Sequence, residues 1–172
     1  MGRNNNTKRL TVCAMLAALG VILLYVGSLI EVADLSMAVL ASLMCVFAVI
    51  EYGKSAPWLV FGVTAVLSLV LLPNKSPAVM YTFFFGFYPI LKERFEQKSR
   101  RLCWIFKELV FNASLAVILV VLKFLLWTAA DIPIEMYVIG VVLCEAVFIL
   151  YDIALTRLIS FYVYRLRKRF KL

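Results

Sequence analysis

The chain has 172 residues, of which 65% are hydrophobic and only 16% are charged. Soluble domains carry about 25% charged residues, so this composition, with a mean hydropathy of +0.98, excludes a single water-soluble core. The formal net charge is +8, but the basic residues lie between and after apolar runs, which indicates membrane orientation rather than nucleic-acid binding.

Apolar runs along the chain predict six membrane-spanning helices, and therefore an all-α polytopic membrane protein with a single integral membrane domain. The predicted spans are 10–30, 35–50, 57–72, 77–91, 102–128 and 134–157, followed by a basic tail over 158–172. The first run follows basic residues, as in a signal peptide, but it is long enough to cross about 30 Å of hydrocarbon. We interpret it as a retained span. The second to fourth runs are short, so some are expected to be tilted, buried or only partly exposed to lipid.

The distribution of basic residues predicts that both termini are cytoplasmic. With the amino terminus placed inside, the inner segments hold almost all lysines and arginines, including the charged loop predicted over 92–101 and the tail. The outer loops then hold a single base, Lys75. This is the positive-inside pattern of multi-pass membrane proteins.

The sequence PNKSP (73–77) is predicted to form an outer hairpin between the third and fourth spans. Pro77 suits the first turn of a helix, where its missing N–H costs little. Asn74 and Lys75 are candidate residues for covering a solute pocket, although a solvated loop tip explains them equally well. Tyr81 lies one turn inside the hairpin and is a further candidate for contacting a ligand.

Charged residues inside the last two spans are the other candidates for a binding site, because a charge at membrane depth normally faces a cavity or a partner. Lys123 and Glu145 would differ in depth by roughly 7–8 Å on antiparallel helices, within reach of each other. They form either a structural ion pair or part of an outer pocket, which Trp127 would also line. Extension of the lysine to the interface is a third interpretation. Trp58, Trp104 and Trp127 fall at predicted span ends, as interfacial anchors do.

The sequence contains no motif that predicts catalysis, a metal or a cofactor. It has no histidine, and we find no phosphate-binding loop, no nucleophile elbow and no zinc-protease motif. The cysteines form no C-x-x-C pair and lie in or beside apolar stretches, which favours packing roles; they are Cys13, Cys45, Cys103 and Cys144. We therefore expect a protein that is not an enzyme.

Small residues are spaced at one helical turn in the first span, where Ala14 and Ala18 occur in the stretch TKRLTVCAMLAALGVIL. Such spacing lets helices approach closely, and Gly20 and Gly27 are expected to lengthen the same surface. With its six predicted spans and this first helix, the chain resembles the substrate-binding (S) components of energy-coupling-factor (ECF) transporters.

The resemblance implies a bacterial cytoplasmic membrane protein that captures a vitamin-like small solute in an outer pocket. It also implies that Ala14 and Ala18 contact a coupling transmembrane subunit, which in turn binds ATPase subunits. The pocket patterns of the riboflavin, thiamine, biotin and cobalamin groups are not recognisable here, so the solute stays open. The alternative is an MreD-like or orphan membrane scaffold that binds other membrane proteins or anionic lipid and no small solute.

Overall fold

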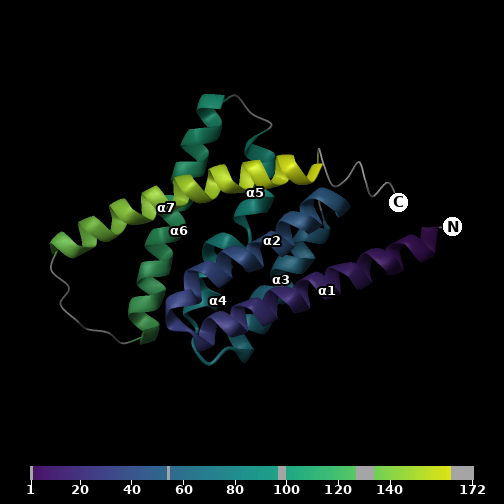
Figure 1. The fold of residues 1–172 in the computed structure, drawn as a ribbon, viewed down its shortest axis with the longest axis horizontal. Helices are drawn as coiled ribbons and strands as arrows, with labels where there is room; N and C mark the ends of the chain where they lie inside the picture. Colours follow the sequence, from purple (N-terminus) through teal and green to yellow (C-terminus); the bar gives the residue numbers. More distant parts are fainter. Residues whose placement is uncertain (1, 54, 97–99, 127–133, 164–172) are drawn as a thin grey trace. The chain divides into compact units, whose positions relative to one another are not determined.

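The computed structural model describes residues 2–53, 55–96, 100–126 and 134–163, and every element in these ranges is helical (Figure 1). The elements are α1 (Gly2–Leu29), η1 (Glu31–Ala33), α2 (Asp34–Tyr52), α3 (Ala56–Leu71), α4 (Ser76–Met80), η2 (Tyr81–Phe85), α5 (Tyr88–Phe95), α6 (Arg100–Leu126) and α7 (Ile134–Phe161). Within these described ranges, four segments are long and apolar enough to cross a membrane: Thr7–Leu29, Asp34–Tyr52, Leu102–Val121 and Ile139–Phe161. The predicted all-α class is thereby confirmed, with several helices suited to a membrane.

The helix ends follow local sequence signals. The helix α2 stops at Gly53, whose φ of 68° is in the left-handed region that favours glycine. Its N–H donates to the carbonyl of Val49 over 3.3 Å. The helix α3 stops before Leu72, whose extended backbone is typical of a residue that precedes proline. These ends lie within about two residues of the predicted span limits.

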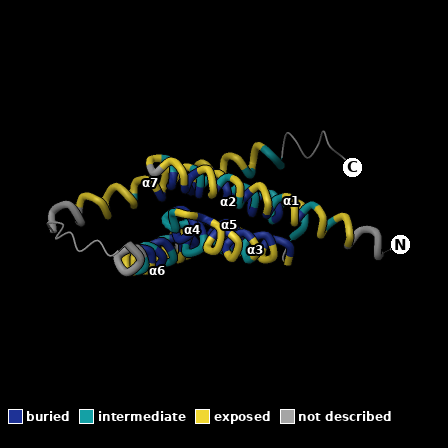
Figure 2. Tube along the Cα trace, turned by 90° about the horizontal axis from the view of Figure 1, so that it is seen from below, coloured by how far each residue is buried: buried dark blue, intermediate teal, exposed yellow. Residues whose placement is uncertain are grey.

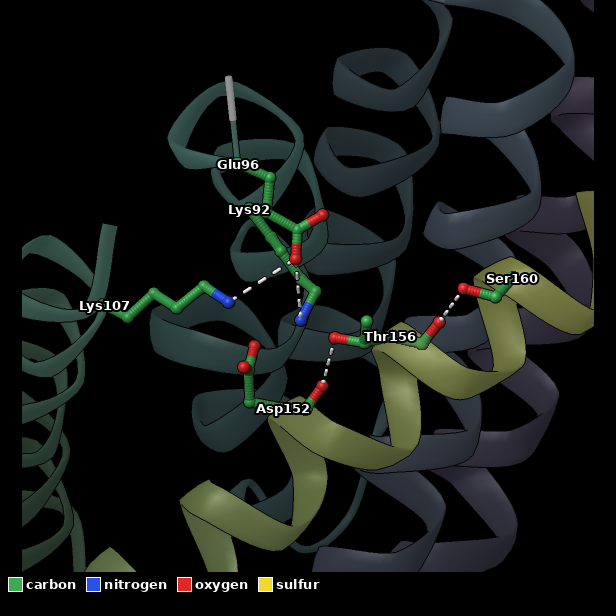
Figure 3. A network of polar contacts seen from close by, with 6 residues as sticks. All are labelled: Lys92, Glu96, Lys107, Asp152, Thr156 and Ser160. Carbon is green, nitrogen blue, oxygen red and sulfur yellow. Dashed lines mark hydrogen bonds and ion pairs between the residues drawn. The ribbon is translucent and has the colours of Figure 1, made fainter. Parts of the chain in front are cut away.

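The chain forms two compact units, residues 1–126 and 127–172. The first unit contains all helices from α1 to α6. In the second unit the structure describes α7, in which two hydroxyls bond to backbone carbonyls one turn earlier (Figure 3). Thr156 donates to the carbonyl of Asp152 over 2.9 Å, and Ser160 donates to that of Thr156 over 2.8 Å.

The helix α2 is the central helix of the first unit and contacts α1, α3, α4, η2 and α5. Small side chains line one of its faces and are completely buried: Ala38, Ala41, Cys45 and Ala48. Small residues allow helix backbones to approach closely, which is how helices associate where lipid removes the hydrophobic driving force. The sequence therefore places α2 inside the bundle through side-chain size, not through polarity.

The helix α1 has one packed face and one open face, which Figure 2 shows as alternating buried and exposed segments along its tube. Gly20 and Gly27 belong to the packed face. An added Cβ on Gly20 would lie 3.1 Å from Cγ2 of Thr64, and one on Gly27 would lie 2.8 Å from Cβ of Met37. The expectation that these glycines extend the alanine surface is therefore wrong, because both support packing against α2 and α3.

The fourth predicted span, 77–91, is not one continuous α-helix. A π-helical turn, η2, interrupts it, and the N–H of Gly86 donates to the carbonyl of Tyr81 over 2.7 Å. Phe61 of α3 packs against Gly86 so closely that an added Cβ would lie 2.5 Å from its Cδ2. Hydropathy alone does not reveal such a break, since the run of apolar residues continues through the π-helical turn.

The helical segment also continues beyond the predicted end at Leu91, as far as Phe95. Residues 92–95 of the predicted charged loop are therefore helical, and Arg100 already belongs to α6. The prediction ended the span at its first charge. Lys92 is nevertheless only 1% exposed, because it has an ion partner one turn later.

Candidate functional site

Asn74 and Lys75, two of the predicted pocket residues, lie in the turn between α3 and α4 and contact their own chain. Asn74 Nδ2 donates to Oδ2 of Asp34 over 3.4 Å, and its Oδ1 accepts from the N–H of Ser76 over 3.0 Å. Lys75 Nζ donates to the carbonyl of Leu72 over 2.6 Å. The first residue ties this turn to the start of α2, and the second caps the carboxyl end of α3, where a positive charge is favourable.

Tyr81, the third candidate, is completely buried within the first unit. Its hydroxyl lies 3.1 Å from Sγ of Cys45 on α2, and its ring centroid is 6.2 Å from that of Phe61 on α3. The aromatic ring therefore packs against α3 while the hydroxyl is satisfied by α2. This is the environment of a core tyrosine.

Replacing Tyr81 by phenylalanine is expected to lower the free energy of unfolding by about 1 kcal/mol, the usual worth of one buried hydrogen bond. Thermal unfolding in detergent micelles measures this change. The matched control is Tyr25→Phe, because Tyr25 is 44% exposed on α1 and its replacement should leave stability unchanged. Loss of small-solute binding with unchanged stability would instead place Tyr81 in a pocket.

Thr82 was not predicted as a site residue, but the structure gives it an unusual environment. Its Oγ1 is buried within the π-helical turn and has no hydrogen-bond partner among the described residues. A buried polar atom left without a partner costs about 1–3 kcal/mol. No sequence signal indicates this, because a threonine in an α-helix normally donates to the carbonyl one turn earlier.

Lys123, Trp127 and Glu145 cannot be assembled into the predicted pair or pocket from the described residues. The side chains of Lys123 and Trp127 lie outside them. Glu145 lies on α7, in the second unit, and is half-buried. All three interpretations of these residues stay predictions.

A cluster of charged residues joins α5 to α6 within the first unit. Oε1 of Glu96 lies 3.3 Å from Nζ of Lys92 and 3.5 Å from Nζ of Lys107, so two ammonium groups share one carboxylate oxygen (Figure 3). Both lysines are nearly inaccessible, with 1% and 5% of their surface exposed. The spacing of Lys92 and Glu96, one helical turn, is a sequence signal for the first of these pairs.

Elsewhere in the first unit, Arg9 connects α1 to the segment between α2 and α3. Its guanidinium donates to Oγ of Ser55 over 2.6 Å. Together with the contact between Asn74 and Asp34, this hydrogen bond marks the two opposite ends of the α1–α2–α3 bundle. We call these the Arg9 end (Arg9 and Ser55) and the Asp34 end (Asp34, Asn74 and Lys75).

Ala14 and Ala18, the predicted partner-binding residues, both lie on the open face of α1. Cys13 and Ala17, which precede them, are 4% and 2% exposed and pack inward. The two alanines are exposed, because no other described element buries them. The face also carries apolar side chains that are half or more exposed, among them Met15.

Among the described residues, no group of three or more acidic, cysteine or histidine side chains is arranged to hold a metal ion. No protein-family model, curated protein or solved structure matches the chain. The functional argument therefore depends on the residues and contacts described above.

Proposed function

We propose that the chain crosses the membrane six times, with the short helix α3 and the interrupted segment α4–η2–α5 adding two crossings to the four long helices. Three connections support this topology. The Asp34 end contains the turns α1–α2 and α3–α4, whereas the Arg9 end contains the turn α2–α3. Because α3 runs between the same two ends as α1 and α2, it crosses wherever they cross.

The charges of the two ends assign the orientation in this proposal. Lys8 and Arg9 lie at the Arg9 end, and Lys92, Arg94 and Lys107 lie on the same side of the membrane if the interrupted segment crosses once. The Asp34 end contributes one base, Lys75, together with the carboxylate of Asp34. The positive-inside rule then places the Arg9 end and both termini in the cytoplasm.

The function proposed for this topology is that of an S component-like subunit of an ECF-type uptake transporter in a bacterial cytoplasmic membrane. The observation that carries it is the open position of Ala14 and Ala18, because the small residues of α1 that support its own fold are a different set. A coupling transmembrane subunit with a complementary small-residue helix could approach this face closely. The captured ligand would be a vitamin-like solute, and ATPase subunits would supply the energy.

The scaffold alternative is favoured by a separate observation. Asn74, Lys75 and Tyr81, the described candidates for the solute pocket, are engaged in contacts that hold the first unit together. An MreD-like or orphan scaffold needs no pocket, and it would use the same face of α1 to bind another membrane protein. The two functions therefore differ in the ligand and in the identity of the partner.

A leucine at position 14 is expected to weaken association with the partner by roughly tenfold or more, because an overpacked interface costs about 1–3 kcal/mol. The stability of the isolated chain should not change, since Ala14 is exposed. The matched control is Ala113→Leu, an exposed alanine on α6. Co-purification from the native host measures association, and full retention of partners by Ala14→Leu would exclude this face as the interface.

Native mass spectrometry of the gently purified, tagged protein separates the two functions. A stoichiometric small molecule together with a coupling subunit and ATPase subunits would establish the transporter component and reveal its solute. Cell-wall synthesis or morphogenesis proteins without a small molecule would establish the scaffold. The Ala14→Leu protein provides the control for partner-dependent signals.

A further inference from the structure

The helix α3 is too short for a bilayer of ordinary thickness. It has 16 residues, which corresponds to about 24 Å at 1.5 Å per residue, whereas the hydrocarbon core is about 30 Å thick. The span in α6, Leu102–Val121, has 20 residues and reaches about 30 Å. The first unit therefore combines helices of unequal apolar length.

Polar contacts at both ends prevent α3 from compensating by sliding or by extending its apolar surface. At the Asp34 end, the ammonium of Lys75 is held at the last carbonyls of α3, 2.6 Å from that of Leu72 and 3.4 Å from that of Val70. At the Arg9 end, the guanidinium is bound to Ser55, the residue before the helix. Both cationic groups belong at the membrane–water interface, so they limit the apolar length of α3 at its two ends.

The uncharged stretch of the neighbouring helix has the same length. In α2, Asp34 and Glu51 bound residues 35–50, again about 24 Å of helix. The carboxylate of Asp34 contacts Asn74, directly beyond α3. The uncharged part of α2 and the helix α3 thus have similar lengths at this end. Tilting would shorten their projection across the bilayer further and so cannot remove the mismatch.

A broad face of α3 is available to lipid. Its exposed apolar side chains, which run from the first turn to the last, include Trp58 (40%), Leu59 (55%), Val63 (45%), Val66 (62%), Val70 (72%) and Leu71 (56%). Lipid acyl chains beside this face would have to be shorter or less extended, because placing either polar end of α3 in hydrocarbon is costly.

We propose that the bilayer beside the exposed face of α3 is locally thinned. This face then binds short-chain lipids more tightly than the longer-chain lipids whose length matches the span in α6. This inference rests on the proposed crossing of α3 and adds its consequence for the surrounding lipid. The proposed ligand is the lipid bilayer itself, which is recognised through the apolar length of α3, about 24 Å, and not through a lipid headgroup.

Two single-tryptophan proteins test the proposal by local fluorescence quenching. One retains Trp58 on α3, and the other retains Trp104, which is 43% exposed on α6; the remaining tryptophans, including Trp127, are changed to phenylalanine. Each protein is reconstituted into a series of phosphatidylcholines with acyl chains of about 14 to 22 carbons. Each of these lipids is mixed with a brominated phosphatidylcholine, which quenches tryptophan fluorescence. Quenching reports the relative binding of each lipid next to each tryptophan.

At Trp58 we expect lipids of about 14–16 carbons to bind about threefold more tightly than those of about 20 carbons, with the optimum at Trp104 shifted to longer chains. Lys75→Leu, which removes the anchor, should shift the Trp58 optimum toward longer chains. Lys8→Leu, an equivalent change on the longer helix α1, should leave the Trp58 optimum unchanged. The same chain-length dependence at both tryptophans would overturn the proposal while leaving the six crossings intact. No quenching at Trp58 would overturn the crossing of α3 as well.

Discussion

Replacing Gly86 by alanine is expected to lower the free energy of unfolding by about 1–3 kcal/mol, the usual cost of an overpacked interior. The new Cβ would lie 2.5 Å and 2.8 Å from two ring carbons of Phe61, and 2.9 Å from a ring carbon of Tyr81. Neither ring can easily retreat. Phe61 also contacts the rings of Trp58 and Phe87, and Tyr81 is completely buried.

The matched control for this variant is Gly62→Ala on α3. A Cβ at that position meets no atom within 4 Å, so stability should be unchanged or slightly raised through the better helix propensity of alanine. Thermal unfolding in detergent and titration with a denaturing detergent measure both variants. Equal stability of the Gly86→Ala and Gly62→Ala proteins would show that α3 and the π-helical turn are not packed as described.

Neutralising Glu96 with glutamine is expected to destabilise the first unit by about 1–2 kcal/mol. The change removes the negative charge shared by two buried ammonium groups, those of Lys92 and Lys107, while keeping the size of the side chain. The effect should be smaller at high salt, because Glu96 itself is 42% exposed and its field is partly screened.

Glu93→Gln provides the control, since this exposed carboxylate lies on the same helix three residues earlier. It should leave the unfolding midpoint within the error of the measurement at every salt concentration. If Glu96→Gln behaves in the same way, the shared carboxylate does not contribute to holding α5 against α6. A loss of stability that is independent of salt would indicate that glutamine disturbs packing instead.

The candidate site could be predicted from sequence only where the signal is local. Pro77, one turn before Tyr81, correctly indicated a helix start beyond the hairpin, and the alanine spacing of α1 indicated residues that do lie on one face. The partners of Asn74 and Tyr81 were not predictable, because Asp34 and Cys45 lie about 40 and 36 residues away in the chain. Spacing along one helix carries no information about which neighbouring helix supplies a hydrogen bond.

The sequence by itself determined the helical class, the presence of several helices suited to a membrane and about two thirds of the helix boundaries, but not the start of α1, the interrupted fourth span or the end of α7. These properties depend on composition, on runs of apolar residues and on proline and glycine at helix ends, all of which act locally. The tertiary structure alone decided which small residues pack inside and which stay open, since alanine and glycine are equally suited to both. It also decided the break at Tyr81–Phe85 and the burial of Lys92, because a close approach by Phe61 and a carboxylate one turn away exist only once the helices pack.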